Sequence, residues 1–132
     1  MKIISTINPT PQNIQEVVEV VCHVTGVSQH QLYSKSRYRE YVAARNMCYS
    51  IMRLGLGMTL TSIANEFDKH HATILYAVKI NQRDLEMSGS YRSRFEHILL
   101  RLGVGFTEQI SHGDTIKLIR ENMFRRESIV ID

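Results

Sequence analysis

The sequence predicts an all-α protein, a helix-turn-helix bundle of about six helices. Apolar residues recur at spacings of three and four through most of the chain, which is the period of a helix with one buried face. The two prolines, Pro9 and Pro11, both lie near the start, so the later helical patterns are not interrupted by a residue that lacks the backbone N–H. Two short apolar stripes also flank a tight polar break within residues 59–82.

The first half of the chain divides into helices separated by glycines and by a basic loop. Residues 1–11 are predicted to form an extended lead-in, followed by a helix over about residues 12–25 that ends at Gly26. Ser28 is a suitable N-cap for a short helical turn. A longer helix is predicted over residues 40–54. The predicted buried residues of the two longer helices are Ile14, Val17, Val18, Val21, Val24, Ala44, Met47, Cys48, Ile51 and Leu54.

The two apolar stripes predict a helix-turn-helix. The first consists of Leu60, Ile63, Ala64 and Phe67, and the second of Ile74, Leu75, Val78 and Leu85. Residues 68–71 between them are polar and too few for anything but a turn, so the two helices must cross steeply. Thr59 is the expected N-cap of the first helix, and the second is expected from about His70 to Met87.

The rest of the chain contains one clear helical segment and a terminal extension. Ser88-Gly89-Ser90 is expected to break the chain, with Ser90 as the N-cap of a helix over residues 91–102. The inward residues of that helix are expected to be Phe95, Ile98, Leu99 and Leu102. The predicted domain therefore covers residues 12–102. A C-terminal extension follows over residues 103–132, with one amphipathic helix predicted at about residues 114–126.

The positive charge of the chain is concentrated in one segment. The whole chain has a formal net charge of +3, yet residues 33–53 alone contain five basic residues against the single acidic Glu40. A local excess of this kind suits a polyanionic partner such as nucleic acid. Residues 33–39, with arginine and tyrosine alternating, have no apolar period and are expected to form an exposed basic loop that enters a narrow DNA minor groove. An ordinary solvent-exposed loop is the alternative.

Several classes of function find no support in the residues. The 132 residues contain no Gly-rich Walker loop, no activated nucleophile and no paired acid and base, so we expect no ATPase, no catalytic residues and no cofactor. His70 and His71 diverge by about 100° on a helix and have no matching second cluster, so no metal site is expected. Cys22 and Cys48 lack CxxC spacing and are expected to be reduced, in a cytoplasmic protein without a membrane span.

The ordered motifs resemble the C-terminal DNA-binding domain (domain IV) of the bacterial replication initiator DnaA over roughly residues 12–100. Residues 34–39 resemble an SKxRxR basic loop, and residues 41–47 approximate a VAxxRxM-like helix. Residues 60–67 stand where initiators show SLxEIGxxF, and residues 70–74 correspond to the DHxTV signature. The resemblance implies a Trp repressor-like, DnaA domain IV-like fold and a stand-alone DNA-binding protein without the AAA+ ATPase of full initiators.

The resemblance implies a role for each matching residue. Arg37, with Arg39 nearby, matches the arginine that enters the minor groove. The long helix supplies backbone contacts, and the start of the second helix of the pair reads bases in the major groove. The expected DNA-binding residues are Lys35, Arg37, Arg39, Arg45, Asn46, Arg53, Lys69, His70, His71, Ala72 and Thr73.

Two of these positions depart from the family pattern. The family aspartate that accepts from a cytosine amino group is His70 here, and a histidine can both donate and accept. The family Thr or Ser two positions later is Ala72, which offers only a methyl group. We therefore expect the scaffold to be kept while the base preference changes.

Three functional hypotheses follow. The first is a monomeric, sequence-preferring double-stranded DNA binder in replication initiation or its regulation. The second is a protein-interaction module on a helix-turn-helix scaffold, whose extension from Asp114 docks on a replication protein. The third is a transcriptional regulator of the Trp repressor type, which would need a dimer. The basic loop favours the first.

Overall fold

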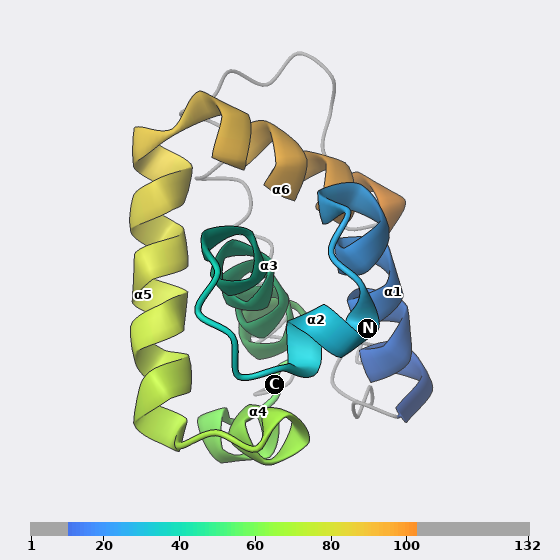
Figure 1. Cartoon of the computed structure of the whole chain (residues 1–132), viewed down its shortest axis with the longest axis vertical. Helices are drawn as coiled ribbons and strands as arrows, with labels where there is room; N and C mark the ends of the chain where they lie inside the picture. Colours follow the sequence, from blue (N-terminus) through green and yellow to red (C-terminus); the bar gives the residue numbers. More distant parts are fainter. Residues whose placement is uncertain (1–10, 103–132) are drawn as a thin grey trace, which may run out of the picture.

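The computed structural model describes residues 11–102, which form six α-helices and one π-helical turn. In chain order these are α1 (Pro11–Thr25), α2 (Gln29–Tyr33), α3 (Arg39–Ser50), η2 (Ile51–Gly55), α4 (Leu60–Phe67), α5 (His71–Met87) and α6 (Gly89–Arg101). Figure 1 looks almost along α3, with the other helices arranged around it. The predicted all-α bundle is confirmed. The predicted helix over residues 114–126 and the lead-in over residues 1–10 lie outside the described residues.

Helix α1 starts one residue earlier than expected, because Pro11 is its first residue and not the last of the lead-in. Proline suits this position, since the first N–H groups of a helix have no acceptor within it. Gly26 ends the helix as predicted, with a φ of 81° that few other residues adopt. Val17, Val18 and Val21 are buried as predicted.

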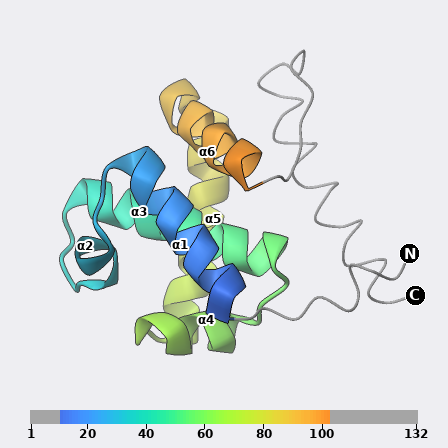
Figure 2. The same cartoon turned by 90° about the vertical axis from the view of Figure 1, so that its right-hand side faces the viewer.

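Helix α3 is buried along most of its length, from Ala44 to Ser50. Helices α5 and α1 both pack against it, as Figure 1 and the turned view in Figure 2 show. A helix covered on nearly all sides must also bury its polar residues, here Arg45, Asn46 and Ser50. A buried charged group such as the Arg45 guanidinium needs hydrogen-bond partners inside the protein. The partners of Arg45 lie in the loop before α3 and become important for the candidate site.

Helices α4 and α5 form the predicted helix-turn-helix. Thr59 caps α4 as expected, because its hydroxyl accepts the N–H of Ser62 at 3.0 Å. Asp68 then adopts the left-handed conformation, with φ 55° and ψ 54°, which aspartate tolerates better than most residues. The N–H of Lys69 donates to the carbonyl of Ala64 at 2.8 Å and closes the turn. Only residues 68–70 therefore connect α4 to α5, which lies at a steep angle to it in Figure 1.

Helix α5 begins at His71, one residue later than predicted. The ring Nδ1 of His70 accepts the N–H of Ala72 at 3.1 Å, so His70 is the N-cap of α5 and not its first residue. An N-cap side chain satisfies one of the helix N–H groups that has no partner within the helix. His70 therefore has a structural role that its sequence context did not predict.

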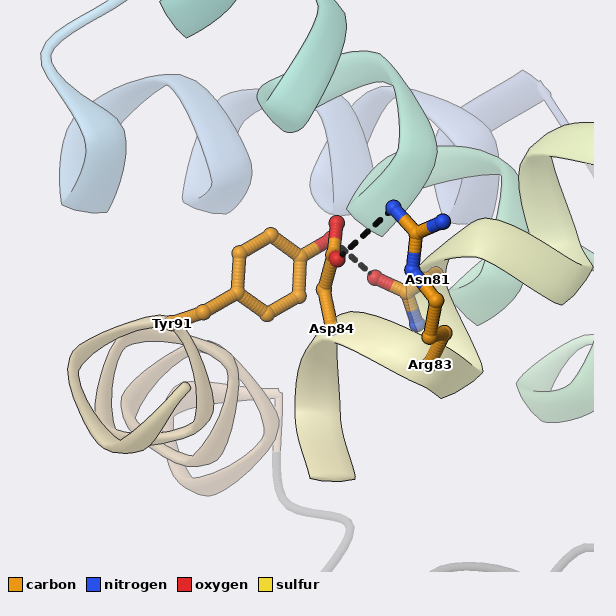
Figure 3. Close-up of polar contacts among 4 residues, drawn as sticks. All are labelled: Asn81, Arg83, Asp84 and Tyr91. Atoms are coloured by element: carbon orange, nitrogen blue, oxygen red, sulfur yellow. Dashed lines mark hydrogen bonds and ion pairs between the residues drawn. The ribbon is translucent and has the colours of Figure 1, made fainter. Parts of the chain in front are cut away.

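The buried stripe of α5 differs from the prediction at Leu75, whose side chain is 43% exposed. The residues that face the core are Ile74, Ala77, Asn81 and Leu85. Leu75 follows Ile74 by one position and therefore points about 100° away from this stripe. Asn81 takes a place where an apolar residue would be expected. Figure 3 shows how it is satisfied, with the hydroxyl of buried Tyr91 donating to the Asn81 side-chain carbonyl.

Helix α6 begins at Gly89, earlier than the predicted start at Tyr91. Ser88 alone separates it from α5, and the Ser88 hydroxyl accepts the N–H of Tyr91 at 3.3 Å. Ser88, rather than Ser90, is therefore the N-cap. The buried residues Phe95, Ile98 and Leu99 were correctly predicted, and Leu102 is half-buried.

Both cysteines are free thiols, as predicted, with Cys22 half-buried and Cys48 buried. Burial raises the pKa of both thiols, which keeps them protonated and poorly reactive. Within residues 11–102, no helix is long and apolar enough to cross a membrane.

Candidate nucleic-acid interface

A groove of ≈ 840 Å³ lies between the start of α3 with its preceding loop and the outer side of α5. Figure 1 shows the loop between α2 and α3 running alongside α5. We call this feature the basic groove. The loop and α3 contribute Lys35, Arg37, Val42, Arg45, Asn46 and Tyr49, the turn contributes Lys69, and α5 contributes Ala72, Thr73, Tyr76, Ala77, Ile80 and Arg83.

In the structure the basic loop is limited to residues 34–38, because Tyr33 ends α2 and Arg39 begins α3. Short-range hydrogen bonds hold its backbone. The Ser34 hydroxyl donates to the Gln31 carbonyl at 2.7 Å and accepts the N–H of Ser36 at 3.3 Å. The Ser36 hydroxyl in turn accepts the N–H of Tyr38 at 3.2 Å. Serine side chains commonly stabilise turns in this way. The two serines thus fold the loop while the side chains of Lys35 and Arg37 remain exposed.

The predicted phosphate contact of Arg45 implied a surface position, but the structure shows that Arg45 is buried. Its side chain is 6% exposed and reaches from α3 under the basic loop. The guanidinium donates to the backbone carbonyls of residues 31, 32, 34 and 36, and also to the Ser34 hydroxyl, at 2.6–3.1 Å. The sequence could not reveal this, because the acceptors are backbone atoms that every residue possesses. Phosphate contact by Arg45 stays a prediction, as does phosphate contact by Asn46, which is 8% exposed.

The basic groove concentrates positive charge from separate segments of the chain. Its cationic residues are Lys35, Arg37, Arg45, Lys69 and Arg83. The ion pairs Lys35–Asp68 at 3.7 Å and Arg83–Asp84 at 3.4 Å (Figure 3) lie at the surface, where such pairs contribute little. Burial lowers the pKa of Lys69, and the charges of Arg45 and Lys35 lower it further. The cations therefore repel one another, and a bound anion would relieve that repulsion.

The start of α5 presents the residues predicted to read bases. His71, Ala72 and Thr73 are exposed, and the rings of His70 and His71 stack with their centroids 4.4 Å apart. Ala72 and Thr73 line the basic groove, whereas the two histidines are not among its lining residues. The helix-turn-helix thus brings Lys69, Ala72 and Thr73 together with the basic loop.

Besides the two histidines, two further residues of the predicted set, Arg39 and Arg53, are not among the lining residues of the groove. Arg39 is the first residue of α3 and is exposed. Arg53 lies in the π-helical turn and donates to the carbonyl of Met58 at 3.1 Å, across the loop that leads to α4.

The groove also contains residues that sequence reasoning missed, above all Tyr76. Its side chain is 66% exposed and lies one turn after Ala72 on the same face of α5. Arg83 continues that face two turns further on. The helical spacing of Ala72, Tyr76, Ile80 and Arg83 indicates a common face of α5. The sequence alone could not show that this face lines a groove with the basic loop.

The family model described as "Bacterial dnaA protein helix-turn-helix" matches residues 14–80, just over half of the chain. The chain belongs to the bacterial DnaA helix-turn-helix family. This is a DNA-binding domain family and not a catalytic one. The matched region contains every lining residue of the basic groove except Arg83.

Three curated relatives illustrate the similarity to DnaA. The chain is 30% identical to the chromosomal replication initiator protein DnaA of Oleidesulfovibrio alaskensis over 73 residues, or 55% of this chain and 16% of that protein. It is 33% identical to the DnaA of Thermotoga petrophila over 66 residues, or 50% of this chain and 15% of that protein. It is 28% identical to the DnaA of Thermodesulfovibrio yellowstonii over 93 residues, or 70% of this chain and 21% of that protein. The chain therefore spans only about a fifth or less of the length of these DnaA proteins.

No group of three or more His, Cys, Asp or Glu residues within residues 11–102 could hold a metal ion. His70 instead uses one ring nitrogen to cap α5.

Proposed function

We propose that the protein binds double-stranded DNA with a sequence preference, in the cytoplasm, and acts in replication initiation or its regulation. The start of α5 enters the major groove, and the basic loop enters the adjacent minor groove. The observation that carries this proposal is the basic groove, which gathers cationic side chains from the loop, the turn and α5 on one side of the molecule. The family supports it, because the chain is similar to proteins named as chromosomal replication initiators.

Arg45 is excluded from the phosphate contacts in this proposal, because its guanidinium is already bound to the basic loop. The phosphate contacts come from the other four cations of the groove, which are Lys35, Arg37, Lys69 and Arg83. Neutralising four phosphates on duplex DNA gives a log–log slope of affinity against salt of about −3.6. We expect that slope in fluorescence-anisotropy titrations with a short duplex at several salt concentrations. A protein-interaction module would instead bind duplex DNA weakly or not at all, and that result would overturn the proposal.

The base contacts in this proposal come from the exposed N-terminal turn of α5 and from Tyr76. Thr73 and Ala72 carry methyl groups that suit the methyl of thymine, and the Thr73 hydroxyl also suits a phosphate. Tyr76, 66% exposed on the same face, adds an aromatic surface and a hydroxyl one turn later. His71 is also exposed and contacts a further base edge in this proposal.

The N-cap geometry of His70 allows a more specific prediction of the base that this residue prefers. Its Nδ1 accepts the N–H of Ala72, so the neutral ring carries its proton on Nε2. An outward N–H donor suits a base acceptor such as guanine O6 or N7, or thymine O4. The aspartate that the family pattern has at this position is an acceptor and suits the amino group of cytosine. We therefore expect this one position of the target site to change from a donor base to an acceptor base.

Partner and oligomer predictions remain open proposals. The C-terminal extension, proposed to contact a replication protein, lies outside residues 11–102. A monomer is the expected state, whereas a regulator of the Trp repressor type would bind as a dimer. Analytical ultracentrifugation of the protein with and without a duplex distinguishes the two.

A further inference from the structure

The side chain of Arg45 connects the centre of the fold to the basic loop. It starts from the buried stretch of α3, and its guanidinium contacts five acceptors, four backbone carbonyls and one hydroxyl, of which three share the two N–H groups of Nη2. The four carbonyls belong to residues 31, 32, 34 and 36, so they span the end of α2 and the first half of the loop.

Only arginine could make this set of contacts. Its planar guanidinium carries five N–H donors in a fixed arrangement, whereas lysine carries three donors on one nitrogen atom. The distances of 2.6–3.1 Å to acceptors on several sides therefore depend on the shape of the guanidinium as well as on its charge. Without it, carbonyls that now lie beneath the loop would lose their charged donor.

We propose that Arg45 is a positioning residue that fixes the shape of the basic loop, so that Arg37 is already placed for the minor groove before DNA binds. This inference rests on the proposed DNA-binding function and adds to it a residue that acts through another residue. Arg37 itself lies on the groove side of the loop, two residues after the Lys35 backbone and directly after Ser36, whose carbonyl Arg45 holds at 2.6 Å.

The expected effect follows from the entropy of the loop. Fixing the backbone of a single residue changes an equilibrium constant by roughly tenfold, and the loop contains five residues. If Arg45 fixes even one of them in the free protein, binding need not order that residue later. Losing the guanidinium while keeping the charge should therefore weaken binding by about tenfold or more.

The test compares Arg45→Lys, Arg37→Ala and the double variant by duplex-binding titration. Arg45→Lys keeps the positive charge and removes the shape of the donor set. We expect Arg45→Lys to reduce affinity about tenfold and to make the salt slope less steep by about 0.9, because Arg37 no longer neutralises a phosphate. We also expect Arg37→Ala to reduce affinity much less in the Arg45→Lys background than in the wild type, because a disordered loop no longer presents Arg37.

A matched control separates positioning from general loss of stability. Arg92 is also a buried arginine, 9% exposed, and donates to the carbonyl of Leu85 on the side of the molecule formed by α5 and α6. Arg92→Lys should lower thermal stability without changing the effect of Arg37→Ala. Amide hydrogen exchange at residues 34–38 should accelerate in Arg45→Lys and stay as in the wild type in Arg92→Lys.

If Arg45→Lys does not fold, Ser34→Ala can be used to test the same proposal. Ser34→Ala removes one acceptor of Arg45 and the hydroxyl that accepts from Ser36, and leaves α3 untouched. It should accelerate exchange in the loop and weaken binding severalfold. If loop exchange and the effect of Arg37→Ala both stay at wild-type values in the folded variants, the positioning role is wrong. If the wild type binds no duplex at all, the proposed function fails instead.

Discussion

Replacing Arg37 with alanine is expected to lower affinity for duplex DNA by about tenfold, or roughly 1.4 kcal/mol, and to remove any preference for A/T-rich flanks. The side chain is exposed, lines the basic groove and projects from a loop whose backbone is held by Ser34, Ser36 and Arg45. Such an arginine enters a narrow minor groove with little loss of loop entropy. Anisotropy titrations with duplexes that differ only in their flanks measure both effects.

Lys79→Ala is the matched control for this experiment. Lys79 is an exposed cation on α5 that lies outside the groove lining. Its removal should lower affinity only slightly, through the long-range field, and should leave the flank preference as it is. Equal losses for the two variants would mean that general positive charge, and not the basic loop, accounts for binding.

Replacing Phe67 with alanine is expected to destabilise the protein by about 3–5 kcal/mol, a large share of the stability of a small domain. Phe67 is 3% exposed at the end of α4. Its ring stacks on Tyr33 with centroids 4.6 Å apart and contacts Tyr49 edge to face at 4.9 Å. It therefore joins the helix-turn-helix to α2 and α3, which lie on either side of the basic loop. Urea unfolding followed by circular dichroism measures the change.

Phe67→Leu provides the control, because it keeps an apolar side chain and removes the aromatic contacts. Each of the two contacts contributes about 0.5–1.5 kcal/mol, so a loss of roughly 1–3 kcal/mol is expected. A loss below 1 kcal/mol for Phe67→Ala would contradict the tight packing of α4 on this part of the core.

The helices could be predicted from the sequence because their apolar residues follow the helical period and their ends carry local signals. Thr59 as a cap, Gly26 as a stop and the polar turn at residues 68–70 all act over three or four residues. The prediction failed at Leu75, where two adjacent apolar residues left the direction of the stripe ambiguous. The buried face of α5 runs through Asn81, a polar residue that the sequence did not suggest as buried. Its side-chain carbonyl accepts a hydrogen bond from the Tyr91 hydroxyl in the folded chain.

The candidate site was less predictable, because its geometry depends on contacts between distant segments. Arg45 looked like a surface cation, yet its acceptors are backbone carbonyls 9 to 14 positions earlier in the chain. Tyr76 became a candidate only because the basic loop lies opposite its face of α5. The types of residue in the loop could be recognised from the sequence. Their common placement with the start of α5 required the fold.

The most direct test of sequence-preferring DNA binding is a selection from random duplexes, carried out in parallel with the wild-type protein and with His70→Asp. Aspartate is also a good N-cap, so the variant keeps α5 intact and changes a donor into an acceptor. We predict one enriched motif for the wild type and a change towards cytosine at a single position for the variant, equivalent to about 1–3 kcal/mol. The absence of any enriched motif, or identical motifs for both proteins, would contradict base reading by the start of α5.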